Sequence, residues 1–511
     1  MKRINRFKKI TLLLVLFLVT FACDDSLYEP YETVNTTEDI DYTDFANMKP
    51  ILIGSYERFQ TRGWEEFPLI SVRGDDVNHG GLGDQQPFAD TDMFSYDKDY
   101  WMYNSVWQNY YRDIFDMHTA MEILANFKEA GANPATADQY IAEVKTLRAF
   151  LLFQLARVWG DVFITTSSDP TELLVASISS KEEVLQHISD QMDEAIVKLP
   201  DMHPNQRNDI KGGVTKYTAL AIKAMANLEL KNYQGAADAA GKIISSGNYS
   251  LEPDFYELFK IKGKLNDENI LELQYSDFNQ GEGDSRNYLN DFFGPQGWTP
   301  AVEGAGSGWG FYEPSVKYIK FMLDRGETVR LETSVLFTNS GIDILKSDPA
   351  YATLPEWISN TTRDGDVIND YARAKFASGK HYLPSNQLIP GRTGYGSNKN
   401  FTVIRYAEVL LMYAEALTHG ASGSGMTADQ AVNDIRNRAG LTPLSGVTTQ
   451  QVMDEKFAEM AMEWGIRYYD MLRLGTTNEL SYDGRTFSED KAYLPYPQAQ
   501  IDQIPALRTG N

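Results

Sequence analysis

KYTALAIKAMANLELKNYQGAADAAGKIISSGNYSL, residues 216–251, is the segment that decides the fold. Both halves carry small or apolar residues at helical spacing: Leu220, Ala224 and Leu228 in the first half, and Ala236, Ala240 and Ile243 in the second. The pattern breaks at Asn232, and the second half ends at Gly247, a residue suited to the left-handed position after a helix. The segment predicts two short antiparallel helices with the length of a tetratricopeptide-type repeat, about 34 residues. Such a pair cannot bury its apolar face alone, so we expect further helix pairs to stack on it.

Other amphipathic segments supply those partners. Helical periodicity occurs in residues 48–59, 104–127, 138–159, 181–199, 402–418, 427–439 and 449–474. In the last segment Glu463 and Arg467 are four residues apart, and we expect them to form a structural pair across one turn. The segment NILELQY, residues 269–275, is expected to form a strand or a buried turn, and residues 313–400 are irregular. The predicted fold is mostly α, a helical body of tetratricopeptide-type helix pairs with long irregular ligand-binding loops inserted on one face.

The first 45 residues differ from the rest of the chain. MKRINRFKK carries five positive charges, and an apolar run from Ile10 to Phe21 leads to Ala22 and Cys23. This order is typical of an export signal, and the run is too short to span a membrane comfortably. The alternative is a buried N-terminal helix followed by an incidental cysteine. The acidic stretch after Cys23 lacks an apolar period, which favours an extended tether. We therefore predict a lipoprotein signal peptide (1–22), a lipid anchor and acidic tether (23–45) and a single folded domain (46–511).

Composition excludes several functions. With 42% hydrophobic and 12% aromatic residues, the chain can build a large core. A formal charge of -24 repels phosphate backbones and anionic lipids, so nucleic-acid binding is not expected. The chain has one cysteine, which cannot form an intramolecular disulfide, and no zinc-ligand spacing is found.

Two segments combine aromatic rings with glycine, Asp, Asn and Arg. They are residues 61–103 and 276–312, and they separate helical scaffold segments at 46–60, 104–251 and 401–475. Most such rings anchor a loop to the body, but aromatic planes beside polar groups also suit a sugar, whose C–H face stacks while its hydroxyls form hydrogen bonds. A stretch from Pro390, PGRTGYGSNKN, is expected to be a third loop at the same surface. The candidate ligand-binding residues are Trp64, Asp76, Tyr96, Trp101, Trp298, Trp309 and Tyr312.

Several motifs in series resemble those of the SusD/RagB family of Bacteroidetes outer-membrane lipoproteins. They include EVKTLRAFLLFQLARVWGDVFI from Glu143, RYAEVLLMYAEAL from Arg405, EKFAEMAMEWGIRYYDMLRLG from Glu455 and YLPYPQAQID from Tyr493. The resemblance implies a lipid on Cys23, an outer-membrane, cell-surface location and a SusC-like TonB-dependent transporter as partner. It also implies that the two ring-rich loops capture oligosaccharides for import, although a few family members take up peptides.

Neither catalysis nor a cofactor is expected. The chain lacks a Gly-x-Ser-x-Gly elbow, a His-Glu-x-x-His pair and a Walker A sequence. Residues 76–81 faintly resemble a calcium loop, but Pro87 stands where the bidentate Glu should be, so we interpret this stretch as a turn. The leading hypothesis is therefore a non-catalytic protein that binds a neutral glycan of β-glucan or fructan type. A peptide-binding uptake protein, and less so a glycan-degrading surface enzyme, remain as alternatives.

Overall fold

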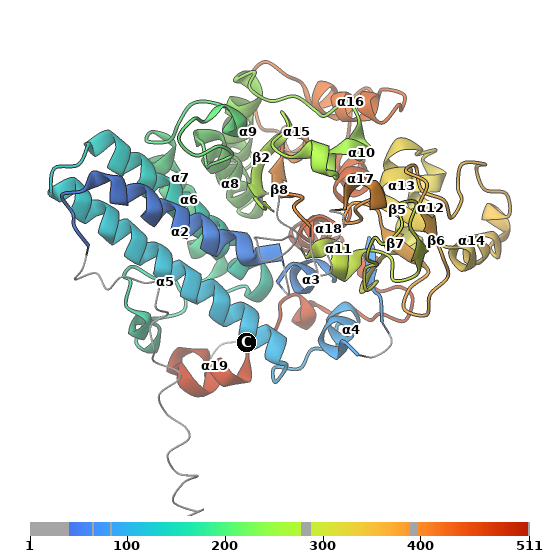
Figure 1. The fold of residues 1–511 in the computed structure, drawn as a ribbon, viewed down its shortest axis with the longest axis horizontal. Coiled ribbons are helices and arrows are strands. Elements are labelled where there is room, and N and C mark those ends of the chain that lie inside the picture. Colours follow the sequence, from blue (N-terminus) through green and yellow to red (C-terminus); the bar gives the residue numbers. More distant parts are fainter. Residues whose placement is uncertain (1–39, 64–65, 82–83, 277–287, 389–396, 509–511) are drawn as a thin grey trace, which may run out of the picture.

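The computed structural model describes residues 40–63, 66–81, 84–276, 288–388 and 397–508. Helices dominate these ranges, and the strands are short and paired two by two (Figure 1). The predicted signal peptide, Cys23 and most of the predicted tether lie outside the described residues, as do Trp64 and most of the predicted third loop. Across the described ranges, none of the helices combines the length and hydropathy needed to span a membrane.

The N-terminal half is an array of helices that pack in chain order. Helix α5 lies on α6, α6 on α7, α7 on α8 and α8 on α9, while α2 covers α5 and α6. The bounds are α2 Met48–Gln60, α5 Trp101–Glu129, α6 Pro134–Trp159, α7 Lys181–Ile196, α8 Lys216–Glu229 and α9 Tyr233–Ser245. Every helix predicted between residues 48 and 251 is therefore confirmed, with ends shifted by a few residues.

The central pair α8 and α9 forms for the expected reasons. The small residues of both helices, among them Ala224 and Ala240, are buried, so the two backbones approach closely. The Asn232 side chain accepts a hydrogen bond from the backbone N–H of Gly235 at 3.1 Å and so caps the start of α9. Gly247 adopts φ +69° just beyond the end of α9, the left-handed conformation that glycine tolerates without a steric penalty.

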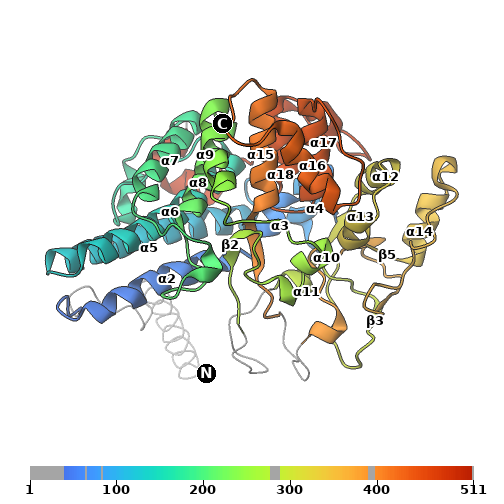
Figure 2. The ribbon, with the colours of Figure 1, turned by 90° about the horizontal axis from the view of Figure 1, so that it is seen from above.

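The array continues into the C-terminal part. Helix α9 packs on α15 (Tyr406–Thr418), which in turn contacts α16 (Ala428–Arg438) and α17 (Thr449–Met460). Figure 2 shows α7, α8, α9 and α15 side by side, with α16 to α18 (Ile466–Leu474) completing the body. The stacked helix pairs predicted by the sequence are thus the architecture of the protein.

The prediction of one continuous helix over residues 449–474 is wrong. It breaks after Met460 and resumes at Ile466, because Met462, Trp464 and Gly465 adopt left-handed backbone angles with φ of 64°, 51° and 67°. Such angles are unfavourable for Met and Trp, so contacts from distant segments must impose them. The Met462 N–H donates to Asp76 Oδ2 at 2.6 Å, and the Trp464 indole N–H donates to the Thr402 carbonyl at 2.9 Å.

The pair predicted between Glu463 and Arg467 is also wrong, because the break turns the two side chains apart. Glu463 instead pairs with Arg405 at 2.9 Å and Lys380 at 2.7 Å. Arg467 pairs with Asp75 at 2.7 Å. Both residues serve the tertiary structure, as expected, but with partners far away in sequence.

Short strands join segments that are distant along the chain. Four antiparallel pairs are present in the described ranges: β1 (Val77–His79) with β4 (Tyr312–Pro314), β2 (Asn269–Leu273) with β8 (Phe401–Arg405), β3 (Trp298–Thr299) with β6 (Val367–Ile368), and β5 (Val335–Phe337) with β7 (Phe376–Ser378). The NILELQY segment is therefore a strand, one of its two predicted states. Residues 401–405, in contrast, form strand β8, so the predicted helix 402–418 begins only at Tyr406.

The segments predicted to be mostly loop also contain short helices. They are α3 (Glu66–Ser71), α4 (Gln86–Asp92), α11 (Leu289–Phe293), α12 (Val316–Asp324), α13 (Val329–Ser334) and α14 (Asn339–Lys346). Two more short helices, α10 (Phe255–Leu258) and α19 (Gln498–Gln503), lie in segments for which no element was predicted. The irregular character predicted for residues 313–400 is therefore wrong in part, because α12, α13 and α14 lie there. Most of these helices are too short to be stable alone, so they form only because tertiary packing stabilises them.

Candidate functional site

The structure brings the two ring-rich segments together. Strand β1 of the first pairs with β4 of the second, and the Gly80 N–H donates to the Phe311 carbonyl at 2.8 Å. The Phe88 ring on α4 packs on Phe292 and Phe311, with ring centroids 6.3 and 6.5 Å apart. Two segments more than 200 residues apart in the chain are thus packed together in one region.

Trp309 and Trp298 are the half-buried tryptophans of this region. The Trp309 ring lies against Phe292 and Phe311, at 5.2 and 5.9 Å between centroids. The Trp298 ring meets Tyr382 edge-on at 6.2 Å, and strand β3 is held by its pairing with β6. Both rings rest on buried aromatic side chains, which orients them and leaves part of each surface accessible.

Tyr371 links the two tryptophans. Its side chain lies against Gly297 and Gly310, so closely that a Cβ on either glycine would meet it. Trp298 directly follows the first glycine, and Trp309 directly precedes the second. We call Trp298, Trp309 and Tyr371 the aromatic platform.

Polar groups lie beside the aromatic platform. Arg373 binds Asp84 through two hydrogen bonds of 2.5 and 2.6 Å, and its guanidinium lies over the Phe311 ring at 4.1 Å. The Asn369 amide donates to the Thr299 hydroxyl at 3.0 Å, next to Trp298. The Arg373 charge is thus paired, and amide and hydroxyl groups adjoin the rings, an arrangement that suits a neutral polyhydroxylated ligand.

Two other candidates lie elsewhere. Trp101 begins α5 and is 55% exposed, and its helix is bound to the C-terminal helix α19 through Asn104 and Gln500. Helix α4 separates it from the aromatic platform, since Tyr100 contacts Asp90 on α4 while Phe88 of the same helix faces Phe311.

Tyr96 is half-buried and fixes the C-terminal segment rather than facing the platform. Its hydroxyl donates to the Lys491 carbonyl at 3.0 Å, and its ring packs edge-on against Phe94. Trp64 is a further candidate, and it lies outside the described residues.

Asp76 and Tyr312 are only 1% exposed, so neither presents a side chain to a ligand on the described surface. Tyr312 packs among Phe67, Phe293 and His381 in the core. Asp76 holds the break in the C-terminal helix through Met462, as described above. Both residues are thus buried side chains that support the structure of this region and do not contact a ligand at its surface.

Burial gives Asp76 a distinctive pH dependence. Its Oδ1 atom is buried without a hydrogen-bond partner among the described residues, and burial raises the pKa of the carboxyl from 3.8 to about 6. Between about pH 4 and pH 6 the folded protein therefore keeps a proton that the unfolded chain has lost, so stability falls as pH rises through this window.

Asp76→Asn is expected to remove this contribution while keeping an acceptor for the Met462 N–H. Between pH 4 and pH 6 the free energy of unfolding of the variant should rise, relative to that of the wild type, by up to about 3 kcal/mol. Above pH 6 the difference should stay constant. Urea unfolding at half-unit pH steps measures the difference. Parallel curves for the two proteins would show that Asp76 does not titrate in this way.

Tyr371, Arg373 and Asn369 are site residues that the sequence analysis missed. They lie within residues 313–400, where helical periodicity is too local a signal to place them. The same composition rule used for the two loops, aromatic rings among Asn, Asp and Arg, also describes NDYAR at 369–373 and could have singled them out.

Within the described ranges, no group of three or more His, Cys, Asp or Glu side chains is arranged to hold a metal ion. In the calcium-like stretch, residues 77–79 form strand β1, and the His79 ring contacts Asp92 at 2.6 Å. This stretch is therefore part of the pairing that joins the two segments.

A helical body that presents aromatic rings on inserted segments defines a class of binding protein, and comparisons with known families identify which one. Residues 267–511 match the model of the SusD family, and residues 54–227 match a model described as "Starch-binding associating with outer membrane". The chain belongs to the SusD/RagB family. Glycan-binding proteins of the SusD family are non-catalytic.

Relatives cover nearly the whole chain. SusD-like protein P2 of Formosa agariphila is 27% identical over 92% of this chain and 91% of its own length. A SusD-like protein of Bacteroides ovatus is 21% identical over 99% of this chain and 98% of its own length. Among solved structures, a laminarin-binding SusD-like protein superposes with a TM-score of 0.73 at 23% identity, covering 90% of this chain and 97% of its own. Surface glycan-binding protein A of Bacteroides thetaiotaomicron, in complex with laminarihexaose, superposes with a TM-score of 0.74 at 22% identity. The match covers 91% of this chain and 98% of that protein's chain. These likenesses establish the fold.

Proposed function

We propose that this protein is a cell-surface lipoprotein that captures a neutral oligo- or polysaccharide and delivers it to a SusC-like TonB-dependent transporter without altering it. The observation that carries the proposal is the aromatic platform, where two half-buried tryptophans flank Tyr371 at the junction of the two ring-rich segments. Flat, partly exposed rings beside amide and hydroxyl groups match the apolar face and the hydroxyl rim of a pyranose.

A β-glucan of laminarin type is the ligand we favour. Two proteins that share this fold are described as laminarin-binding or as bound to laminarihexaose. The charge balance supports a neutral ligand, because Arg373 is already occupied by Asp84 and the chain as a whole carries -24. An anionic glycan such as alginate would need an unpaired basic group at the platform and would be repelled by this field.

Surface attachment and partnership rest on the N-terminal residues and on the family. The lipid would be carried by Cys23, followed by the acidic tether to residue 45. A tether of about 21 residues reaches on the order of 70 Å when fully extended, enough for the body to move relative to the membrane while it passes ligand to a transporter.

Calorimetry with the chain from Asp24 onward tests the proposed function. Laminarin and laminarihexaose are expected to bind, whereas alginate is not, and no reducing sugar should appear during prolonged incubation. Binding of a mixed peptide digest without any glycan binding would favour the peptide-uptake alternative. Release of reducing sugar would indicate an enzyme.

A further inference from the structure

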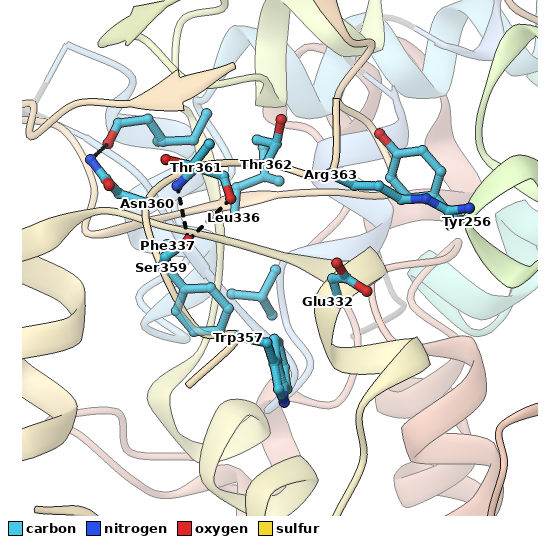
Figure 3. A pocket seen from close by; sticks show the side chains of 12 residues that line it. Tyr256, Glu332, Leu336, Phe337, Trp357, Ser359, Asn360, Thr361, Thr362 and Arg363 are labelled. Atoms are coloured by element: carbon cyan, nitrogen blue, oxygen red, sulfur yellow. Dashed lines mark hydrogen bonds between the residues drawn. The ribbon is translucent and has the colours of Figure 1, made fainter. Parts of the chain in front are cut away.

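A separate pocket lies in the part of the chain where the sequence showed no pattern. It is a shallow hollow: its cavity volume is about 30 Å³, room for about one or two water molecules, so a larger ligand would lie across its mouth. It is lined by Tyr256 on α10, Glu332 on α13, residues 335–337 of β5, Trp357, residues 359–363 and Ile368 on β6 (Figure 3). We call it the Trp357 pocket.

The pocket has an aromatic wall and a polar wall. Figure 3 shows Trp357 and Glu332 on one side, with Asn360, Thr361 and Thr362 on the other. The buried apolar residues of the lining are Val335, Leu336, Phe337 and Ile368. The Trp357 indole N–H, the Glu332 carboxylate and the Thr361 hydroxyl make no hydrogen bond with any other part of the described chain, so they are available to a ligand.

The polar wall is held in place before any ligand binds. The Ile368 N–H donates to the Asn360 carbonyl at 2.7 Å, and the Thr362 N–H donates to the Asp366 carbonyl at 2.8 Å. Arg363 binds Asp254 through bonds of 2.7 and 3.1 Å, and its guanidinium lies over the Tyr256 ring at 4.8 Å. A prearranged wall avoids the entropic cost of ordering a loop on binding.

The charges of the Trp357 pocket disfavour an anion. Asp254 already satisfies Arg363, and Glu332 contributes a negative charge with no basic side chain bonded to it among the described residues. An accessible indole opposite hydroxyl and amide groups, with a carboxylate able to accept hydrogen bonds from sugar hydroxyls, is the chemistry of a neutral pyranose site.

The pocket adjoins the aromatic platform without sharing its exposed rings. Ile368 in its lining pairs with Trp298 across β3 and β6, and Trp298 packs on the small cluster that contains Leu336 and Ile368. Trp309 lies on the other side of Tyr371, among Phe292 and Phe311. The pocket and Trp298 therefore share one small buried cluster.

We propose that the Trp357 pocket is a second sugar-binding site, across whose mouth one or two pyranose units lie, from the same neutral glycan that the aromatic platform binds. The identity of the glycan rests on the proposed function. Two linked sites bind a polymer more tightly than either does alone, because engagement of the second becomes intramolecular.

Calorimetry of the chain from Asp24 onward with laminarihexaose and with laminarin tests this inference. We expect two hexasaccharides per wild-type protein and one per Trp357→Ala protein. Affinity for the polymer should fall about tenfold in that variant through lost avidity, while the remaining hexasaccharide site changes less than twofold. Trp357→Phe keeps a ring and should recover most of the loss. Glu332→Ala, an exposed change unable to prevent folding, should weaken the second site in the same way.

The outcomes separate the two proposals. One hexasaccharide per wild-type protein, or an unchanged polymer affinity in folded Trp357→Ala and in Glu332→Ala, would overturn the second site and leave the proposed function intact. Absence of any glycan binding by the wild type would overturn the proposed function and the second site together. Thermal unfolding of each variant confirms that it is folded.

Discussion

Arg405→Met is expected to lower the free energy of unfolding by about 3–5 kcal/mol, since it removes one partner from a buried group of charges. The Arg405 side chain is 1% exposed and pairs with Glu268 at 2.8 Å, Glu459 at 2.5 Å and Glu463 at 2.9 Å. It also donates to the backbone carbonyl of Glu459 at 2.8 Å. The change therefore loses hydrogen bonds to two segments at once.

The glutamates explain the size of the effect. Burial alone would raise the pKa of Glu459, but Arg438, Arg405 and Arg330 together lower it well below its ordinary value. Without Arg405 these carboxylates remain buried with fewer cations, and methionine offers no hydrogen bond in return.

Urea unfolding measures the loss, with Arg58→Met as the matched control. Arg58 pairs with Asp116 at 2.9 Å, but both side chains are about two-fifths exposed, at 42% and 40%. The control substitution should lower the free energy of unfolding by less than about 1 kcal/mol, because water screens exposed ion pairs. Equal costs for the two variants would contradict the role assigned to the buried group.

Trp309→Ala is expected to weaken laminarin binding about 30-fold, the effect of losing a central aromatic contact worth about 2 kcal/mol. Its ring rests on Phe292 and Phe311 and forms one end of the aromatic platform. Stacking area and orientation are both lost when the indole is removed.

Trp101→Ala provides the comparison, since it removes the same side chain from another part of the surface. Trp101 was also a candidate from the sequence and is 55% exposed, but α4 stands between it and the aromatic platform. We expect its removal to change affinity less than twofold. Calorimetry of both variants, with thermal unfolding as a check on folding, decides which tryptophan binds. The reverse pattern would move the site to the start of α5.

Local pattern predicted the helices well and the interruptions poorly. The pair in residues 216–251 formed as α8 and α9 because its apolar spacing and the cap at Asn232 act within a few residues. The break after Met460 could not be predicted, because it depends on a hydrogen bond from Met462 to Asp76, almost 400 residues away. Local propensity favours a continuous helix there, and the distant contact overrides it.

The candidate site shows the same division. The ring-rich composition of residues 61–103 and 276–312 indicated the right region, since both segments meet through β1 and β4. Composition could not rank the rings. Tyr312 is enclosed by Phe67, Phe293 and His381, while Trp309, three residues earlier, is only half-buried. Tyr371 and Trp357 could be recognised as candidate binding residues only from the tertiary structure, which places the segment 313–400 beside these loops.

The sequence by itself determined the mostly helical body, the stacked pairs and the resemblance to the SusD/RagB family, because periodicity, caps and motifs are written in neighbouring residues. Only the tertiary structure decided which aromatic rings face solvent, which acids are buried and where strands join. Those properties depend on partners hundreds of residues apart, and the solvent exposure of a side chain is set by everything that packs around it.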